Sequence, residues 1–127
     1  MLRNEKGFTL IEIIAVLVIL GILAAVAVPK YISMMDQARI SAAQSAIAEV
    51  KARASNYYAS QMLAKNGKTT SASVLAAVGE APDLGPDYKV SAATHASGIL
   101  ITVGSVKGID LTADNTGIWY YPGLLNP

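Results

Sequence analysis

The chain has 127 residues, with ten basic and nine acidic side chains and a formal net charge of +1. This length allows one small domain, and so balanced a charge gives no electrostatic argument for nucleic acid or an anionic membrane surface as a bulk partner. The absence of cysteine excludes disulfides, thiol chemistry and cysteine-based metal sites. Hydrophobic residues make up 53% of the chain, and much of that excess lies between Leu10 and Val28.

The first predicted element is an apolar run from Phe8 to Val28, in which Glu12 is the only charged residue. A helix of about 20 apolar residues is long enough to cross a bilayer. A single carboxylate near the start of such a helix is costly in lipid and therefore needs a partner. Snorkelling of the Glu12 side chain to the membrane interface is the simpler alternative.

The six residues from Gly7 to Glu12, Gly-Phe-Thr-Leu-Ile-Glu, resemble the class III signal of type IV pilins and pseudopilins, and two basic residues, Arg3 and Lys6, precede them. In that family a membrane enzyme, the prepilin peptidase, cuts after the glycine and N-methylates the new N-terminal residue. The resemblance therefore implies cleavage after Gly7 and methylation of Phe8.

The same resemblance gives Glu12 a role in assembly. It implies that the carboxylate of Glu12 pairs with the α-amino group of Phe8 in a neighbouring subunit, because two opposite charges that are each costly in hydrocarbon neutralise one another. Removal of residues 1–7 as a leader peptide would leave eight basic and eight acidic side chains. Residues 8–28 would form a transmembrane helix that later enters the filament core, and residues 29–127 would form a soluble head.

Two other kinds of N-terminal segment share part of this pattern. Ala25-Val26-Ala27 is similar to the cleavage site of an ordinary secretory signal peptide, although Glu12 would interrupt its apolar region. A plain transmembrane anchor fits the apolar length but leaves Gly7, Phe8 and Glu12 unexplained. The pilin interpretation accounts for all of these residues.

Gly21 and Pro29 are expected to weaken the helix. Glycine destabilises a helix by about 1 kcal/mol relative to alanine. Pro29 cannot donate a backbone hydrogen bond and disfavours helix at Val28, so we expect a kink or a weakened turn there. The helix can still run through in the isolated subunit, because a bilayer offers backbone groups no other partners.

Beyond Pro29 the helical pattern becomes amphipathic and continues to about Ala64. One face carries apolar residues at alternating three- and four-residue spacing, and this stripe is expected to pack on the protein's own sheet. Gly67, between two lysines, is expected to cap the end of the helix. The residues of the stripe are Ile40, Ala43, Ile47, Val50, Ala54 and Tyr57.

The remaining sequence predicts a connecting region, residues 65–87, followed by a small antiparallel sheet over residues 88–127. Within the connection, Ser71 or Ser73 is expected to cap a short helix that stops at Gly79. Short strands with short connections predict a meander, and one face of it must pack on the amphipathic helix because a small sheet alone is marginal. The predicted strands are Tyr88–Ala92, Ile99–Val103, Ile109–Thr112 and Ile118–Tyr121.

The aromatic residues Trp119, Tyr120 and Tyr121 are expected to close the sheet against the helix. Many pilins close their C-terminal region with a disulfide, and this chain departs from that pattern. Packing and hydrogen bonds must therefore hold its last strand.

No catalytic or metal-binding constellation is visible in the sequence. His95 stands alone among Ser, Thr and Ala residues, so a zinc or catalytic role has little support. Asp83 and Asp87 would be the candidates for a calcium site of the kind that some pseudopilins carry, but loop carboxylates are usually turn formers. We therefore expect no metal, no cofactor and no enzymatic activity.

The sequence predicts an α+β protein in which a long N-terminal helix packs on a small C-terminal antiparallel sheet. We expect a structural subunit of a type IV pilus-like filament that polymerises with copies of itself. The resemblance implies an inner-membrane precursor, with the prepilin peptidase and the pilus assembly machinery as partners. It also implies an extracellular filament that serves adhesion, motility or DNA uptake, uses that the sequence does not separate. The alternatives are a major pseudopilin of a type II secretion system and a secreted or membrane-anchored binding domain.

Overall fold

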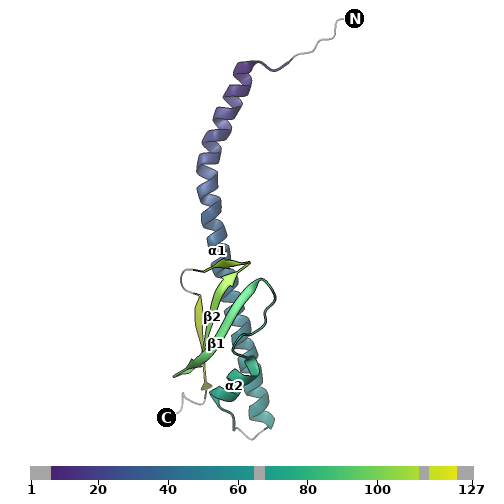
Figure 1. Cartoon of the computed structure of the whole chain (residues 1–127), viewed down its shortest axis with the longest axis vertical. Coiled ribbons are helices and arrows are strands. Elements are labelled where there is room, and N and C mark those ends of the chain that lie inside the picture. Colours follow the sequence, from purple (N-terminus) through teal and green to yellow (C-terminus); the bar gives the residue numbers. More distant parts are fainter. Residues whose placement is uncertain (1–6, 65–67, 112–114, 123–127) are drawn as a thin grey trace, which may run out of the picture. The chain divides into compact units, whose positions relative to one another are not determined.

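The computed structural model describes residues 7–64, 68–111 and 115–122. Its elements (Figure 1) are α1 (Leu10–Ala64), α2 (Ser71–Val78), β1 (Tyr88–His95), β2 (Gly98–Val106), β3 (Ile109–Asp110) and β4 (Thr116–Tyr120). The predicted α+β fold, with a long N-terminal helix and a small antiparallel sheet, is confirmed. Three predicted features, the basic leader residues Arg3 and Lys6 and the helix cap Gly67, lie outside the described residues.

The chain divides into two compact units, Met1–Gln37 and Ala38–Pro127, and α1 runs from the first into the second. Figure 1 shows α1 as an unbroken ribbon, and Pro29 lies inside it. The continuous helix agrees with the expectation that it can run through in the isolated subunit. It begins at Leu10 rather than at Phe8, because Thr9 caps its first turn.

The second unit has a hydrophobic core between α1 and one face of the sheet. Four residues of the predicted helical stripe, from Ala43 to Ala54, are buried there, and Ala46 joins them. The prediction is wrong for Ile40, which is 38% exposed because the core begins only one turn later, at Ala43. The buried hydrophobic residues are Ala43, Ala46, Ile47, Val50, Ala54, Val74, Leu75, Val90, Ala92, Ile99, Ile101, Val103, Val106 and Trp119.

β2 is the central strand of the sheet. β1 pairs with it over its whole length, β3 pairs with Ser105 and Val106, and β4 pairs with Gly98–Thr102. The predicted meander is therefore wrong at its last step, since β4 returns to β2 instead of pairing with β3. The physical reason is the length of β3, because a strand of two residues covers only the end of β2 and leaves the rest of that edge for β4.

The strand boundaries also differ from the prediction. β1 extends to His95 and β2 to Val106, so part of the expected turn between β2 and β3 is strand. That turn is confined to Lys107 and Gly108, whose φ angles of 52° and 74° suit a two-residue hairpin. β3 ends at Asp110, earlier than predicted.

The pairing register explains why glycine is needed at position 117. Ala92, Ile101 and Gly117 lie opposite one another on three adjacent strands, on the face that packs against α1. A Cβ at Gly117 would lie 2.5 Å from Cγ2 of Ile47, so β4 approaches α1 too closely for any side chain. The close approach of β4 to α1 at this point thus depends on one glycine.

α2 has a different cap from the one predicted. Thr70, not Ser71, is the N-cap residue, and its Oγ1 accepts a hydrogen bond from the backbone N–H of Ser73 at 3.2 Å. The N–H of Thr70 donates to Oγ of Ser73 in return, which completes a capping box. The predicted end at Gly79 is confirmed.

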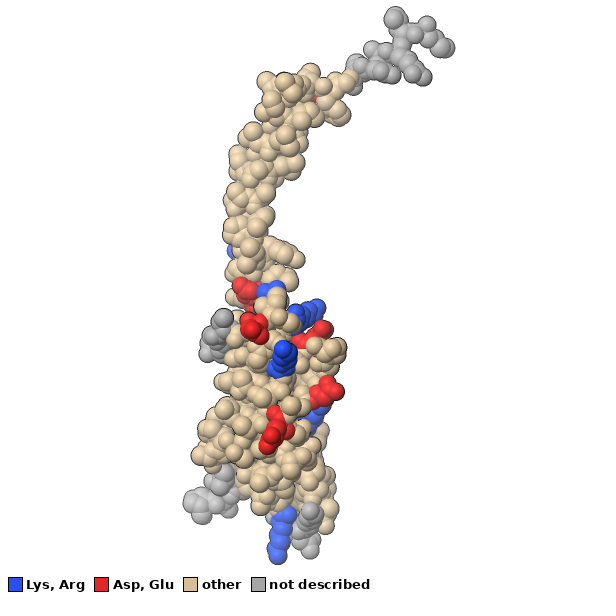
Figure 2. Space-filling view, in the orientation of Figure 1, with Lys and Arg blue, Asp and Glu red and all other residues tan. Residues whose placement is uncertain are grey.

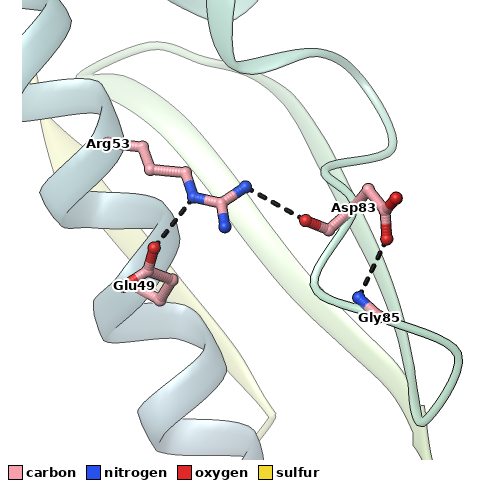
Figure 3. Close-up of polar contacts among 4 residues, drawn as sticks. All are labelled: Glu49, Arg53, Asp83 and Gly85. Carbon is pink, nitrogen blue, oxygen red and sulfur yellow. Dashed lines mark hydrogen bonds and ion pairs between the residues drawn. The ribbon is translucent and has the colours of Figure 1, made fainter.

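A polar bridge joins α1 to the segment before β1 (Figure 3). Nε of Arg53 donates to Oε1 of Glu49 at 2.9 Å, and its Nη1 donates to the backbone carbonyl of Asp83 at 3.0 Å. The Asp83 carboxylate accepts from the N–H of Gly85, as turn-forming aspartates do. The guanidinium therefore ties the segment before β1 to the helix.

Candidate functional site: the apolar N-terminal segment

The described part of the first unit, residues 7–37, exposes all of its apolar side chains. Every residue from 7 to 38 is exposed, including Phe8 at 85%. Figure 2 shows one face of the molecule, on which charged side chains gather on the second unit and few are visible on the described part of the first. A helix that is apolar on every side is normally buried. This segment therefore requires lipid or other helices around it.

By length and composition, α1 is the one helix among the described residues that is able to cross a membrane. Its apolar part lies near the N-terminus, and none of it is buried by the described residues. The exposed large hydrophobic residues of this part are Leu10, Ile11, Ile13, Ile14, Val16, Leu17, Val18, Ile19, Leu20, Ile22, Leu23, Val26 and Val28.

Glu12 has a local partner at the start of α1. The backbone N–H of Thr9 donates to Oε2 of Glu12 at 2.9 Å, and the N–H of Glu12 donates to Oγ1 of Thr9 at 3.3 Å. These two bonds form a capping box, which satisfies two backbone donors that the helix itself leaves free. The carboxylate also lies at the positive end of the helix dipole.

Thr9 is a residue that the sequence reasoning missed, although the signal was available. Threonine followed three residues later by glutamate, just before an apolar run, is the sequence signature of a capping box. The same residues also belong to the predicted processing signal. Glu12 thus has a role within one chain in addition to the predicted pairing with Phe8 of a neighbouring subunit, which stays a prediction.

Gly21 lies in the exposed apolar part of α1, and the space around it is open. A Cβ at Gly21 would meet no atom within 4 Å, so no packing inside the chain demands glycine there. Pro29 is exposed in the middle of the same helix. The predicted weakening role of these two residues stays a prediction.

The candidate sites in the described part of the second unit are weaker than the apolar N-terminal segment. A small open pocket is lined by Ser45, Ala46, Glu49, Leu84 and Tyr88, and its one charged group, Glu49, is already paired with Arg53. Among the described residues, no group of three or more His, Cys, Asp or Glu side chains gathers closely enough to hold a metal ion.

The side chain of His95 makes a local hydrogen bond. It lies at the end of β1, where its Nδ1 accepts a hydrogen bond from the N–H of Ser97 at 3.2 Å. This contact shapes the turn into β2. The apolar N-terminal segment therefore remains the strongest candidate.

The comparison with known proteins points to the same segment. The family model for the prokaryotic N-terminal methylation motif matches residues 2–28. The type II secretion system core protein G of Pseudomonas aeruginosa is 49% identical over 55 residues, which is 43% of this chain and 39% of that protein. The type IV narrow pilus major component PilA5 of Thermus thermophilus is 46% identical over 48 residues, 38% of this chain and 41% of that protein.

A fimbrial protein of Pseudomonas aeruginosa is 40% identical over 53 residues, 42% of this chain and 34% of that protein. The matching segments thus span well under half the length of these relatives. No solved structure matches the chain.

The chain thus combines a prokaryotic N-terminal methylation motif with an exposed apolar helix. The N-terminal segment of this chain is thus similar to segments of type IV pilus and fimbrial proteins and of a type II secretion system core protein.

Proposed function

We propose that this chain is the structural subunit of a type IV pilus-like filament. It is inserted in the inner membrane as a prepilin, cleaved after Gly7, N-methylated on Phe8 and polymerised through its N-terminal helix. The observation that supports the proposal most strongly is that every residue from 7 to 38 is exposed, although the segment from Phe8 to Val28 carries only one charge.

Assembly exchanges one apolar environment for another. The helix of residues 8–28 leaves lipid and enters a bundle of identical helices, so little apolar surface is exposed to water at any stage. Glu12 then loses contact with water, and the ammonium of Phe8 in a neighbouring subunit supplies the opposite charge. Residues 1–7 are the leader, and residues 29–127 form the head of the subunit. The partners are the prepilin peptidase and the pilus assembly machinery, and the mature filament is extracellular.

The test is the mass of the N-terminus after expression of the full chain with a prepilin peptidase. We expect a mature chain that begins with N-methylated Phe8. Gly7→Val should leave an uncleaved precursor in the membrane that does not enter filaments, because the peptidase must accommodate the residue before the cut. Asn4→Ala is the matched control, since it changes the leader away from the cut. A mature-sized chain from the Gly7→Val variant, or a mature chain that begins with Val28, would contradict the proposal.

A second candidate is a major pseudopilin of a type II secretion system. It is favoured by the 49% identity to core protein G over 55 residues. Complementation separates the two candidates. A pilus subunit restores surface filaments to a strain that lacks its major pilin, whereas a pseudopilin restores release of folded proteins to a strain that lacks core protein G.

A further inference from the structure

We infer that Glu12 at one end, and Lys30 with Tyr31 at the other, fix the depth of α1 in a lipid bilayer before assembly. Glu12 lies in the headgroup layer and not in the hydrocarbon. The inference rests on the proposed function and specifies how the subunit is held while it waits in the membrane.

The spacing of the charges is the first argument. Glu12 and Lys30 are 18 residues apart, and no charged residue lies between them. At about 1.5 Å per residue this separation is about 27 Å along the helix, close to the hydrocarbon thickness of about 30 Å. α1 is continuous over this range, so the helical rise applies to all of it. Glu12 and Lys30 can therefore lie in the two opposite headgroup layers at the same time only over a narrow range of helix depths.

Moving the helix along the bilayer normal in either direction is unfavourable in free energy. Moving the helix so that Leu10 and Ile11 enter the hydrocarbon would carry the Glu12 carboxylate in with them, and the penalty for one carboxylate exceeds the gain from two apolar side chains. Moving it the other way would draw Lys30 inward. The small difference between 27 and 30 Å is covered because the long Lys30 side chain reaches outward.

The capping box allows Glu12 to wait at this depth without a neighbouring subunit. One carboxylate oxygen accepts the N–H of Thr9, and the helix N-terminus supplies a favourable field. Its other oxygen is free to bind headgroup water. The pairing with the ammonium of Phe8 is needed only when the helix leaves the lipid, which separates the two roles of Glu12 in time.

Tyr31 completes the anchor on the opposite side. It follows Lys30 directly and is 65% exposed, and tyrosine is enriched at membrane–water interfaces. Beyond it the chain is apolar again, because Ile32, Met34 and Met35 precede the next charge at Asp36. Without Lys30 and Tyr31, these following apolar residues of the helix could also enter the hydrocarbon.

Single-cysteine variants of the full chain test this depth, because the chain has no cysteine of its own. A membrane-impermeant maleimide is applied to spheroplasts, and then to opened membranes. We expect Ser33→Cys to react in intact spheroplasts, Leu10→Cys to react only in opened membranes, and Leu20→Cys to react only in detergent. In a Lys30→Leu, Tyr31→Leu background, labelling of Ser33→Cys should fall about tenfold, whereas a Lys30→Arg, Tyr31→Trp background should preserve it.

Protection of Leu10→Cys in opened membranes would place Glu12 in the hydrocarbon and overturn the inference. Unchanged labelling of Ser33→Cys in the Lys30→Leu, Tyr31→Leu background would contradict the anchoring role of these two residues. Equal labelling at all three cysteine positions would contradict it as well. The N-terminal mass of the same samples keeps the proposed function separate. Expected labelling on a chain that is not cut after Gly7 supports the anchor and contradicts the proposed processing.

Discussion

The indole Nε1–H of Trp119 donates a hydrogen bond to Oγ of Ser55 at 2.9 Å, and this contact joins β4 to α1 across 64 positions of sequence. The rings of Tyr58 and Tyr121 meet the indole edge to face, each with its centroid 6.1 Å away. The hydroxyl of Tyr121 donates to the carbonyl of Thr69. Three aromatic rings and two hydrogen bonds thus hold the last strand where no disulfide is possible. The predicted role of Tyr120 in this closure is wrong, because its alternation on the strand leaves it 58% exposed.

Ser55→Ala should lower the free energy of unfolding by about 1 to 3 kcal/mol, because the partly buried indole N–H loses its acceptor. Urea unfolding of the detergent-solubilised chain, followed by the fluorescence of its single tryptophan, measures this change. Ser60→Ala is the control, since the Ser60 hydroxyl donates only to the carbonyl of Tyr57 in its own helix. Equal losses in the two variants would show that the bond to Trp119 contributes nothing.

Gly117→Ala should destabilise the second unit by about 1 to 3 kcal/mol, because the added methyl group overpacks the interface with Ile47. Gly104→Ala is the matched control on β2, where a Cβ would lie 3.7 Å from the Lys89 carbonyl oxygen, an ordinary contact. Thermal unfolding followed by circular dichroism compares the two. An Ile47→Ala, Gly117→Ala double variant should lose less stability than the sum of the single changes, and strict additivity would rule out the proposed clash.

Glu12→Gln separates the capping role of Glu12 from its charge. Glutamine preserves a capping box, so membrane insertion and helix content should be unchanged, while filament assembly should fall because the ammonium of Phe8 loses its counter-charge. Thr9→Ala should do the opposite, costing about 0.5 to 2 kcal/mol of helix stability while leaving the charge pair possible. Filament yield by electron microscopy and helix content by circular dichroism score both variants. Normal assembly of the Glu12→Gln chain would exclude an essential charge pair.

A Gly21→Ala, Pro29→Ala double variant tests whether the filament core is extensible. Alanine at 29 restores a backbone donor, and together the two changes favour helix by about 4 kcal/mol. We expect the segment between them to lose helical hydrogen bonds in the wild-type filament and to lengthen from about 1.5 toward about 3.3 Å per residue. Filaments of the double variant should therefore be stiffer under load in an optical trap. Equal extensibility, or an unbroken helix in a wild-type filament reconstruction, would contradict this expectation.

The parts of the fold that sequence predicted well are those set by local pattern. The length of α1 to Ala64 follows from sustained helical periodicity, and the burial of Val50 and Ala54 follows from the stripe. The stop of α2 at Gly79 follows from the conformational freedom of glycine. Each of these features depends on residues within a few turns of one another.

The predictions are wrong where contacts between residues far apart in the sequence determine the structure. The pairing of β4 with β2 depends on how much of that edge β3 leaves uncovered, which no property of β4 reveals. The exposure of Ile40 depends on where the core ends along α1. At the candidate site, the roles of Gly7, Phe8 and Glu12 in processing and assembly stay predictions. The capping contact of Thr9 was missed because the same residues also belong to the processing signal.

The 64-position separation of Ser55 and Trp119 also sets an order of events during synthesis. At about 5 to 20 residues per second, a ribosome makes the segment between them in about 3 to 13 s. Throughout that interval the apolar face of α1 has no strand β4 to cover it, while the N-terminal segment is already long enough to enter a membrane. We expect insertion to precede closure of the head. Protease added to nascent chains of increasing length should therefore cut near Ser55 until β4 has emerged, and early protection at that position would reverse the proposed order.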